Sequence, residues 1–263
     1  MNALPWKGSI PERVSGVRIP LSPHKLNMKK PIIGIVLDLE ENGDYSIYPY
    51  YVLRQDYFTA IVKAGGIPVG VSLATESIED YVENLDGLLL PGGDYDIPPQ
   101  MYGDDSIHET VVMKKGRLDF DIKLTNKFLE SDKPIFGICL GEQLLAVLHG
   151  GALVQDIEND LPNALEHYAE DRQKPAHEIK IKEGTLLHSI LGTTTMDVNS
   201  HHHQAVREES PQFTVSARCT DGVIEAIEVP NKKFCLGVQW HPEYLTQSKD
   251  IDIFKAFVDA CRR

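Results

Sequence analysis

The sequence lacks several features that mark large classes of proteins. It has no run of about 18 apolar residues, the shortest typical of a membrane-spanning helix, so we expect no membrane partner. Only four cysteines occur, without C-x-x-C spacing, which favours reduced thiols in a cytoplasm. Positive charge is scarce: the net charge of −13 argues against a nucleic-acid partner. The chain has 263 residues and 42% hydrophobic content, which is enough to form a hydrophobic core.

The most informative segment is PIFGICLGEQ, residues 134 to 143. An apolar stretch predicts a buried strand, a Gly-x-Cys-x-Gly turn follows, and a helical pattern runs from residue 142 to 148. Such an arrangement is typical of a nucleophile elbow, here with Cys139 where hydrolases often have serine. Gly137 and Gly141 would remove side chains where a Cβ would clash. The helix N-terminus would then stabilise a thiolate nucleophile.

A second segment far downstream offers partners for this cysteine. Residues 234 to 240 are expected to form a strand that runs into His241, Pro242 and Glu243. Because proline cannot continue a central strand, the chain turns there and leaves His241 at the strand end. Histidine can act as a general base near neutral pH, and the carboxylate of Glu243 can orient the imidazole. The three residues therefore supply a nucleophile, a base and an orienting group.

Each of these signals also has a simpler interpretation. A lone cysteine after an apolar strand is usually a small core residue, and a lone histidine before proline is usually a turn residue. The bracketing glycines, the following helix and the presence of both segments in one chain favour catalysis instead.

The segments GICLGEQ and GVQWHPE together resemble the class I glutamine amidotransferase superfamily. Within it, the chain resembles the γ-glutamyl hydrolase branch (peptidase C26), which includes γ-glutamyl-γ-aminobutyrate hydrolases. The resemblance covers roughly residues 31 to 260. It implies a three-layer, flavodoxin-like α/β fold with a mostly parallel central sheet, helices on both faces and a reaction that needs no cofactor.

Other positions match motifs of this family. LLPGG, residues 89 to 93, resembles its oxyanion loop, although Pro-Gly-Gly is also an ordinary turn. The resemblance implies that the backbone amides of Gly93 and Leu140 hold the oxyanion. VNSHHHQ, residues 198 to 204, resembles the segment that lines the γ-glutamyl pocket. The implied substrate contacts are Gln143, Ser200, His202 and Gln204.

Three adjacent histidines, 201 to 203, raise the question of a metal. Adjacent side chains on a strand point to opposite faces, and no cysteine or carboxylate stands at ligand spacing beside them. The expectation is therefore that the protein has no metal site.

Three functions are compatible with these residues. The resemblance implies hydrolysis of a γ-glutamyl amine through a γ-glutamyl thioester on Cys139. A glutaminase subunit that passes ammonia to a separate synthase partner is the alternative, and an inactive binding or regulatory homologue is the third. The long segment 94–117, and the expectation that no synthase domain is fused before residue 263, favour the hydrolase. Many members of the branch carry arginine where this chain has Leu140, so the identity of the leaving amine stays open. The sequence also leaves the oligomeric state open, and a homo-oligomer is possible.

The pattern of expected elements divides the chain into two halves. Strands and helices alternate in the first half, which predicts a mostly parallel sheet with helices on both faces. The strands expected there are 32–37, 67–71 and 87–90, and the helices are 51–64, 78–85 and 118–129. The second half has few helices before a closing helix at 252–261, and its strands predict antiparallel additions to the core. These strands are 179–181, 213–217, 223–229 and 234–239.

Two segments stand apart from this pattern. Residues 1–27 hold four prolines and no usable periodicity, which predicts a non-core extension from an over-long start site or an appended segment; a short functional tail is the alternative. A single hydrolase domain is expected over residues 28–263. The polar segment 94–117 is expected to form a wall or lid over the site, with surface variation as the alternative.

Overall fold

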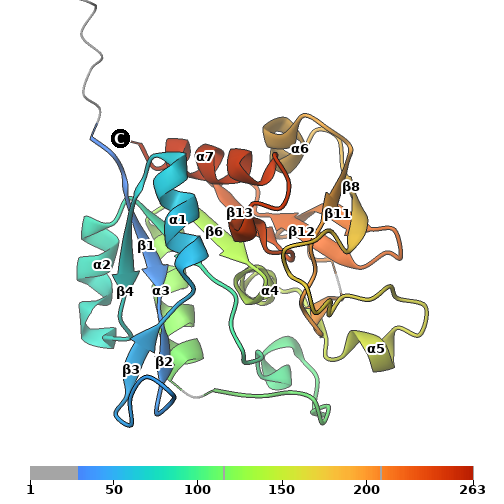
Figure 1. The fold of residues 1–263 in the computed structure, drawn as a ribbon, viewed down its shortest axis with the longest axis horizontal. Coiled ribbons are helices and arrows are strands. Elements are labelled where there is room, and N and C mark those ends of the chain that lie inside the picture. Colours follow the sequence, from blue (N-terminus) through green and yellow to red (C-terminus); the bar gives the residue numbers. More distant parts are fainter. Residues whose placement is uncertain (1–28, 115, 208, 263) are drawn as a thin grey trace, which may run out of the picture.

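The computed structural model describes residues 29–114, 116–207 and 209–262 (Figure 1). The proposed extension, residues 1–27, lies outside the described residues. Among the helices of the described ranges, none is long and apolar enough to cross a membrane.

One nine-stranded sheet organises the fold and carries the site at its middle (Figure 1). In spatial order its strands are β4 (Ile67–Val71), β1 (Ile32–Val36), β5 (Gly87–Leu90), β6 (Ile135–Ile138), β13 (Cys235–Val238), β12 (Ile224–Glu228), β11 (Thr214–Cys219), β8 (His177–Ile181) and β9 (Thr195–Val198). The first five strands pair in parallel, and the last four continue the sheet with antiparallel pairing. The sheet is therefore mixed, with the antiparallel part in the second half of the chain as expected.

One expected antiparallel strand is instead parallel. β13 pairs with β6 in parallel register, with Gly237 opposite Gly137, and is antiparallel only to β12. Its apolar sequence marked a strand but carried no information on direction. The consequence is functional, because the carboxyl ends of neighbouring parallel strands meet at one edge of a sheet. Cys139 and His241, each soon after one of these strands, are brought together there.

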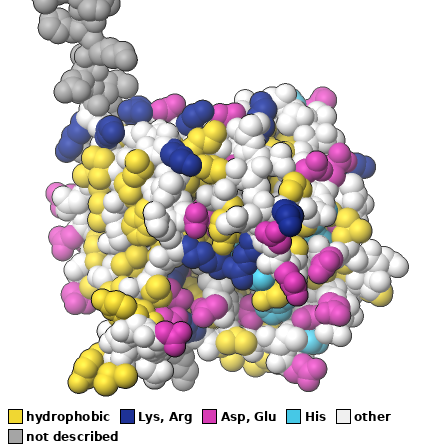
Figure 2. Space-filling model, in the orientation of Figure 1, with side chains coloured by type: hydrophobic (Ala, Val, Ile, Leu, Met, Phe, Trp, Pro, Cys, Tyr) yellow, Lys and Arg dark blue, Asp and Glu magenta, His cyan; other side chains and the backbone are white. Residues whose placement is uncertain are grey.

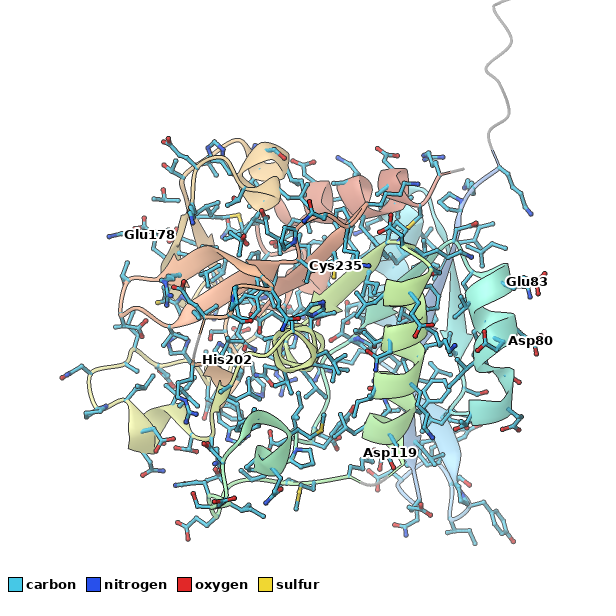
Figure 3. The ribbon with its side chains drawn as sticks, turned by 180° about the vertical axis from the view of Figure 1, so that it is seen from behind. Asp80, Glu83, Asp119, Glu178, His202 and Cys235 are labelled. Carbon is cyan, nitrogen blue, oxygen red and sulfur yellow. The ribbon has the colours of Figure 1, made fainter. Side chains whose placement is uncertain are left out.

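Helices cover both faces of the sheet, because the central strands alternate their side chains between two cores. Leu89 packs into one core with α1 (Gln55–Ala64) and α7 (Asp250–Ala260). Leu88 and Leu90 pack into the other. That second core holds α2 (Ile78–Asn84), α3 (Arg117–Glu130) and α4 (Leu140–Leu148), and Figure 3 shows α2, α3 and α4 on the side opposite α1. The three-layer fold expected from the sequence is confirmed.

Helix α1 is shorter than predicted. Tyr51 and Val52, expected inside the helix, belong to β3 (Tyr50–Val52), which pairs with β2 (Asp38–Glu40) as a separate small sheet. Arg54 is extended, and α1 begins only at Gln55. The residues buried on α1 start at Tyr57; Leu53 packs against the same core from outside the helix, which extended the apolar pattern backwards.

Several short elements gave no usable signal in the sequence. They are β7 (Leu153–Val154), which pairs with β10 (Ala205–Val206), the helices α5 (Ile157–Asp160) and α6 (Leu186–Leu191), and the 3-10 turns η1 (Thr75–Ser77), η2 (Pro99–Tyr102) and η3 (Pro242–Tyr244). With two to six residues each, they are too short for a period to be recognised.

Candidate active site

Cys139 forms the turn between β6 and α4. Its backbone has a φ of 54° and a ψ of −108°, which non-glycine residues rarely adopt. A Cβ on Gly137 would lie 2.6 Å from the carbonyl oxygen of Gly141, and a Cβ on Gly141 would lie 2.3 Å from the carbonyl oxygen of Leu90. The clash predicted for both positions is confirmed. The turn thus places the cysteine at the N-terminus of α4, where the helix dipole favours an anion.

His241 is fixed at both its ring and its backbone. Its Nδ1–H donates to Oε1 of Glu243 at 2.8 Å, and both residues are buried. The side chain of Asn199 accepts from the His241 amide at 2.8 Å and donates to the His241 carbonyl at 2.9 Å. Because Nδ1 is hydrogen-bonded to Glu243, Nε2 of the imidazole is the nitrogen available to a reacting group.

The cysteine and the histidine adjoin each other, as the strand order requires. A Cβ added to Gly92 would lie 3.1 Å from Cε1 of His241 and 3.4 Å from Cβ of Cys139. Burial alone would lower the pKa of His241, but the charge of Glu243 and the hydrogen bond and charge of Cys139 outweigh it and raise the pKa to about 10. The protonated imidazole is therefore favoured, which suits a pair with a thiolate.

The two expected oxyanion residues lie side by side. Gly93 and Leu140 both line the pocket that contains Cys139, and a Cβ on Gly93 would lie 2.8 Å from Cδ2 of Leu140. The amide of the preceding Gly92 donates to the hydroxyl of Tyr57 at 3.1 Å, which ties the loop to α1. This position is compatible with the donor role that the sequence predicts.

The expected substrate contacts divide into two groups. Gln143, His202 and Gln204 line the pocket with Cys139. Nε2 of Gln143 donates to the Gln204 carbonyl at 3.1 Å and to Oε1 of Gln239 at 3.0 Å. Ser200 is buried, and its hydroxyl donates to the carbonyl of His167 at 2.8 Å. Since Ser200 is not among the residues that line the pocket, we leave it out of the proposed contacts.

The pocket has a volume of about 240 Å³ and carries charges of both signs. Arg54 and Arg172 contribute the positive side chains, and Asp94 and Asp96 the negative ones. Figure 2 shows a group of Lys and Arg side chains near the centre of this face, beside histidines and surrounded by acidic side chains. Segment 94–117 supplies part of the lining, so the expectation that it forms a wall is confirmed.

Two arginines of this pocket were not predicted from the sequence. Nη1 of Arg54 donates to the hydroxyl of Tyr244 at 2.7 Å. Arg172 contacts Nε2 of His201, whose Nδ1–H donates to the carbonyl of Ala169 at 2.9 Å. Burial, together with the nearby Arg172 charge, lowers the pKa of His201 to about 4, so a neutral His201 can accept from Arg172. Neither arginine stands in a recognisable motif, so nothing in the sequence marks them.

Glu142 and Asn199 were also missed as parts of the site. Glu142 is fully buried on α4, and burial, reinforced by the charges of Glu225 and Cys139, raises the pKa of its carboxyl well above the usual range. The protonated form of this buried carboxyl is therefore favoured beside the candidate catalytic residues. Asn199 stands inside the VNSHHHQ motif, so the motif located it, but its hold on the His241 backbone depends on the fold.

The reasoning that the sequence offered against a metal is wrong in two respects. The three histidines do not form a strand: only His201 makes an isolated bridge, with Tyr168, and all three line the pocket that contains Cys139. A carboxylate does accompany them, because Glu225 of β12 lies 3.6 Å from Nε2 of His202. Sequence spacing could not indicate a ligand that arrives from a different strand.

The fold is that of the class I glutamine amidotransferases. A crystal structure of a Thermoplasma acidophilum protein, described as belonging to a GMP synthase, superposes with a TM-score of 0.62, covering 89% of this chain and 94% of that chain. The sequences are 18% identical, so this likeness shows the fold alone.

The chain belongs to the Peptidase C26 family, whose model matches residues 31–243. It is 34% identical to the γ-glutamyl-γ-aminobutyrate hydrolase PuuD of Escherichia coli strain K12, over 89% of this chain and 95% of the relative. It is also 34% identical to a glutamine amidotransferase-like protein, RP404, of Rickettsia prowazekii, over 89% of this chain and 99% of the relative. The family supports a hydrolase or an amidotransferase-like protein that acts on γ-glutamyl amides.

Proposed function

We propose that this protein hydrolyses the γ-glutamyl amide bond of a γ-glutamyl amine through a Cys139 thioester. The observation that carries the proposal is the strained elbow cysteine in one pocket with His241, whose ring bonds to the buried Glu243. The similarity to a γ-glutamyl-γ-aminobutyrate hydrolase supports the substrate class. Four free, buried cysteines support a reducing compartment, and we propose the cytoplasm.

The proposed acylation uses Cys139 and His241, which both line the pocket. The Cys139 thiolate attacks the γ-carbonyl carbon, and the new oxyanion accepts from the amides of Gly93 and Leu140. As the C–N bond breaks, Nε2 of His241 gives its proton to the departing amine. Glu243 keeps the imidazole oriented through Nδ1 and stabilises its charged form. A γ-glutamyl thioester remains on the sulfur.

Deacylation reverses the proton transfer with water in place of the amine. His241, now neutral, accepts a proton from a water molecule as the water oxygen attacks the thioester carbonyl. The C–S bond breaks, glutamate leaves, and the thiolate pairs again with the imidazolium. Each step is carried by this chain's own residues.

A glutaminase subunit that serves a separate synthase is the second candidate. The likeness to the GMP synthase protein of Thermoplasma acidophilum favours it, but only at the level of the fold. An inactive binding or regulatory homologue would retain the fold without need for the intact set of Cys139, His241 and Glu243. The three candidate functions differ in the activity that they predict for the isolated chain.

Glutamate release by the isolated protein should separate the three candidates. We expect turnover of γ-glutamyl-γ-aminobutyrate and related γ-glutamyl amines without any partner, and slower turnover of free glutamine. The measurement is glutamate release for glutamine and for several γ-glutamyl amines side by side. If every substrate is inert until a second protein is added, the glutaminase of a two-protein synthase is the correct function. If no substrate reacts while γ-glutamyl compounds still bind, the protein is an inactive binding or regulatory homologue.

We further propose that Arg172 binds an acidic group on the leaving amine. A charged hydrogen bond contributes about 1.5–3 kcal/mol, so Arg172→Gln should raise the KM for γ-glutamyl-γ-aminobutyrate by about tenfold or more. The KM for a neutral γ-glutamyl alkylamine should not change. Lys174→Gln, an exposed site paired with Asp171 outside the pocket, is the matched control. An equal loss for both substrates would instead place the α-carboxylate of the glutamyl group at Arg172.

A further inference from the structure

Behind the catalytic pocket, four buried side chains from separate segments converge on one point. His177 begins β8, Glu225 lies on β12, His202 follows β9, and His167 comes from the irregular segment before β8. Their side chains are at most 1% exposed. The ring centroid of His167 lies 4.6 Å from that of His177 and 4.9 Å from that of His202, with tilted planes. In Figure 3 the labelled His202 lies next to the second-half strands, away from the outer surface where Glu178 points.

The spacing of this cluster is that of metal ligands rather than of hydrogen bonds. Oε1 of Glu225 lies 3.3 Å from Nδ1 of His167, 3.4 Å from Nε2 of His177 and 3.6 Å from Nε2 of His202. A charged N–H···O bond is shorter, about 2.7–2.9 Å. A tetrahedral zinc site with bonds of about 2.0–2.1 Å has edges between ligand atoms of roughly 3.3–3.4 Å.

The cluster atoms also lack ordinary partners. Within the described residues, both carboxylate oxygens of Glu225, Nε2 of His202 and both ring nitrogens of His177 have no hydrogen bond of ordinary geometry, although the Cys219 thiol lies beside His177 and His167. A buried carboxylate without a hydrogen bond is costly unless a cation compensates it. All four ligand atoms lie within 4.8 Å of one another, so one ion could contact them all.

Outer contacts orient two of the three imidazoles so that each keeps its lone-pair nitrogen on the side of Glu225. Nε2–H of His167 donates to Oδ2 of Asp221 at 2.9 Å, which leaves Nδ1 as the lone-pair nitrogen. Nδ1–H of His202 donates to the carbonyl of Gln204 at 2.8 Å, which leaves Nε2. Such second-shell carboxylate and carbonyl contacts are typical of histidines that bind metals.

We propose that His167, His177, His202 and Glu225 bind a Zn²⁺ ion. Three imidazoles and one carboxylate in a tetrahedron suit zinc, and four protein ligands leave no open position, which is typical of a structural site. The ion would join β8 and β12 to the segments that carry the pocket residues 201–204 and Tyr168. The ion would therefore hold the wall of the pocket, and His202 would serve as a zinc ligand rather than as the substrate contact that the resemblance implies.

Two of the four residues border a cavity on the other side of the cluster. His167 and His202 are among the residues that line a second cavity, of about 870 Å³, with His203 and Asp156. In the alternative state the cluster holds no metal, and protons on the histidines balance the charge of Glu225. The alternative ligand is Cys219, whose thiol can also group with His167 and Asp221.

Metal analysis of the full chain, purified without a histidine tag, tests the proposal directly. We expect about one zinc per chain, lost on dialysis against a strong chelator and restored by Zn²⁺. The melting temperature should fall on chelation and recover with the metal. Replacement by Co²⁺ should give the visible absorption of a tetrahedral ion. A strong thiolate-to-cobalt charge-transfer band would overturn the ligand set in favour of Cys219.

Variants keep the proposal testable without an activity assay. His177→Gln and Glu225→Gln should bring the zinc content of folded protein close to zero, and Asp221→Asn should weaken zinc binding by about 10- to 100-fold. His149→Gln, a buried histidine whose ring bonds only to the Leu145 carbonyl within the described residues, is the matched control and should keep its zinc. Should the wild-type chain bind neither Zn²⁺ nor Co²⁺, and melt at the same temperature with and without chelator, the cluster holds protons and the proposal is wrong.

Discussion

Replacing Cys139 by alanine should reduce glutamate release by at least about 10⁴-fold, because the covalent step has no substitute nucleophile. The fold should survive, because alanine also has a Cβ and is no more strained than cysteine in the backbone conformation of this turn. Turnover and the melting temperature measured on one preparation check both halves of this expectation. Cys261→Ala, at the end of α7 and outside the pocket, is the control and should turn over normally.

Covalent labelling gives a second readout of the same prediction. Cys139 is the cysteine that lines the pocket with His241, whereas Cys219 lines a different cavity. Burial raises the pKa of Cys235 to about 12, which disfavours its thiolate. A glutamine-like electrophile should therefore modify Cys139 first, as mass spectrometry of the digested protein would show. Normal turnover by Cys139→Ala, or first labelling at another cysteine, would contradict the proposed mechanism.

The elbow could be predicted from the sequence because its constraints are local. Gly137, Cys139 and Gly141 lie within five positions, and the close approach at Gly137 is to Gly141 of the same turn; only the approach of Gly141 to Leu90 depends on another strand. The oxyanion loop and the His241–Glu243 pair are also short motifs, and the pair makes its hydrogen bond over two residues. These features could be found because their physical causes lie mostly within a few residues and form recognisable motifs.

The features that the sequence could not reveal depend on pairing between distant segments. The direction of β13 is fixed by β6, about a hundred positions earlier, and nothing in an apolar strand specifies a parallel partner. Glu225 reads as a polar residue in a strand, yet the fold buries it against three histidines. Arg172 reaches the pocket from an irregular segment whose course no periodicity marks.

The start of α1 illustrates a different limit. Leu53 and Tyr57 share one core, so the apolar spacing continued smoothly across a boundary between extended chain and helix. Tyr51 and Val52 are exposed and pair with β2, as β-branched and aromatic residues often do. Periodicity identifies which face is buried more reliably than it identifies where a helix begins.

Glu243→Gln should shift the pH dependence of kcat/KM towards acid and lower kcat by up to about 10⁴-fold. The charge of Glu243 is the largest influence that raises the pKa of His241, against the lowering effect of burial. Without that charge, His241 should lose its proton at a lower pH, so the alkaline limb of the profile should move down from near pH 10. The rate falls because the imidazole loses both its orientation and the stabilisation of its charge.

The same shift should appear in stability, with a definite sign. Since the pKa of His241 is raised on folding from about 6.5 to about 10, its contribution is fully present below pH 6.5 and is lost as the pH rises through 10. The melting temperature of the wild type should therefore fall more steeply across this window than that of Glu243→Gln. Asp252→Asn, which removes one negative charge beside Lys255 on α7, is the control and should leave both profiles unchanged. If Glu243→Gln keeps the wild-type alkaline limb, Glu243 does not set the protonation of His241, and the proposed triad is wrong at this residue.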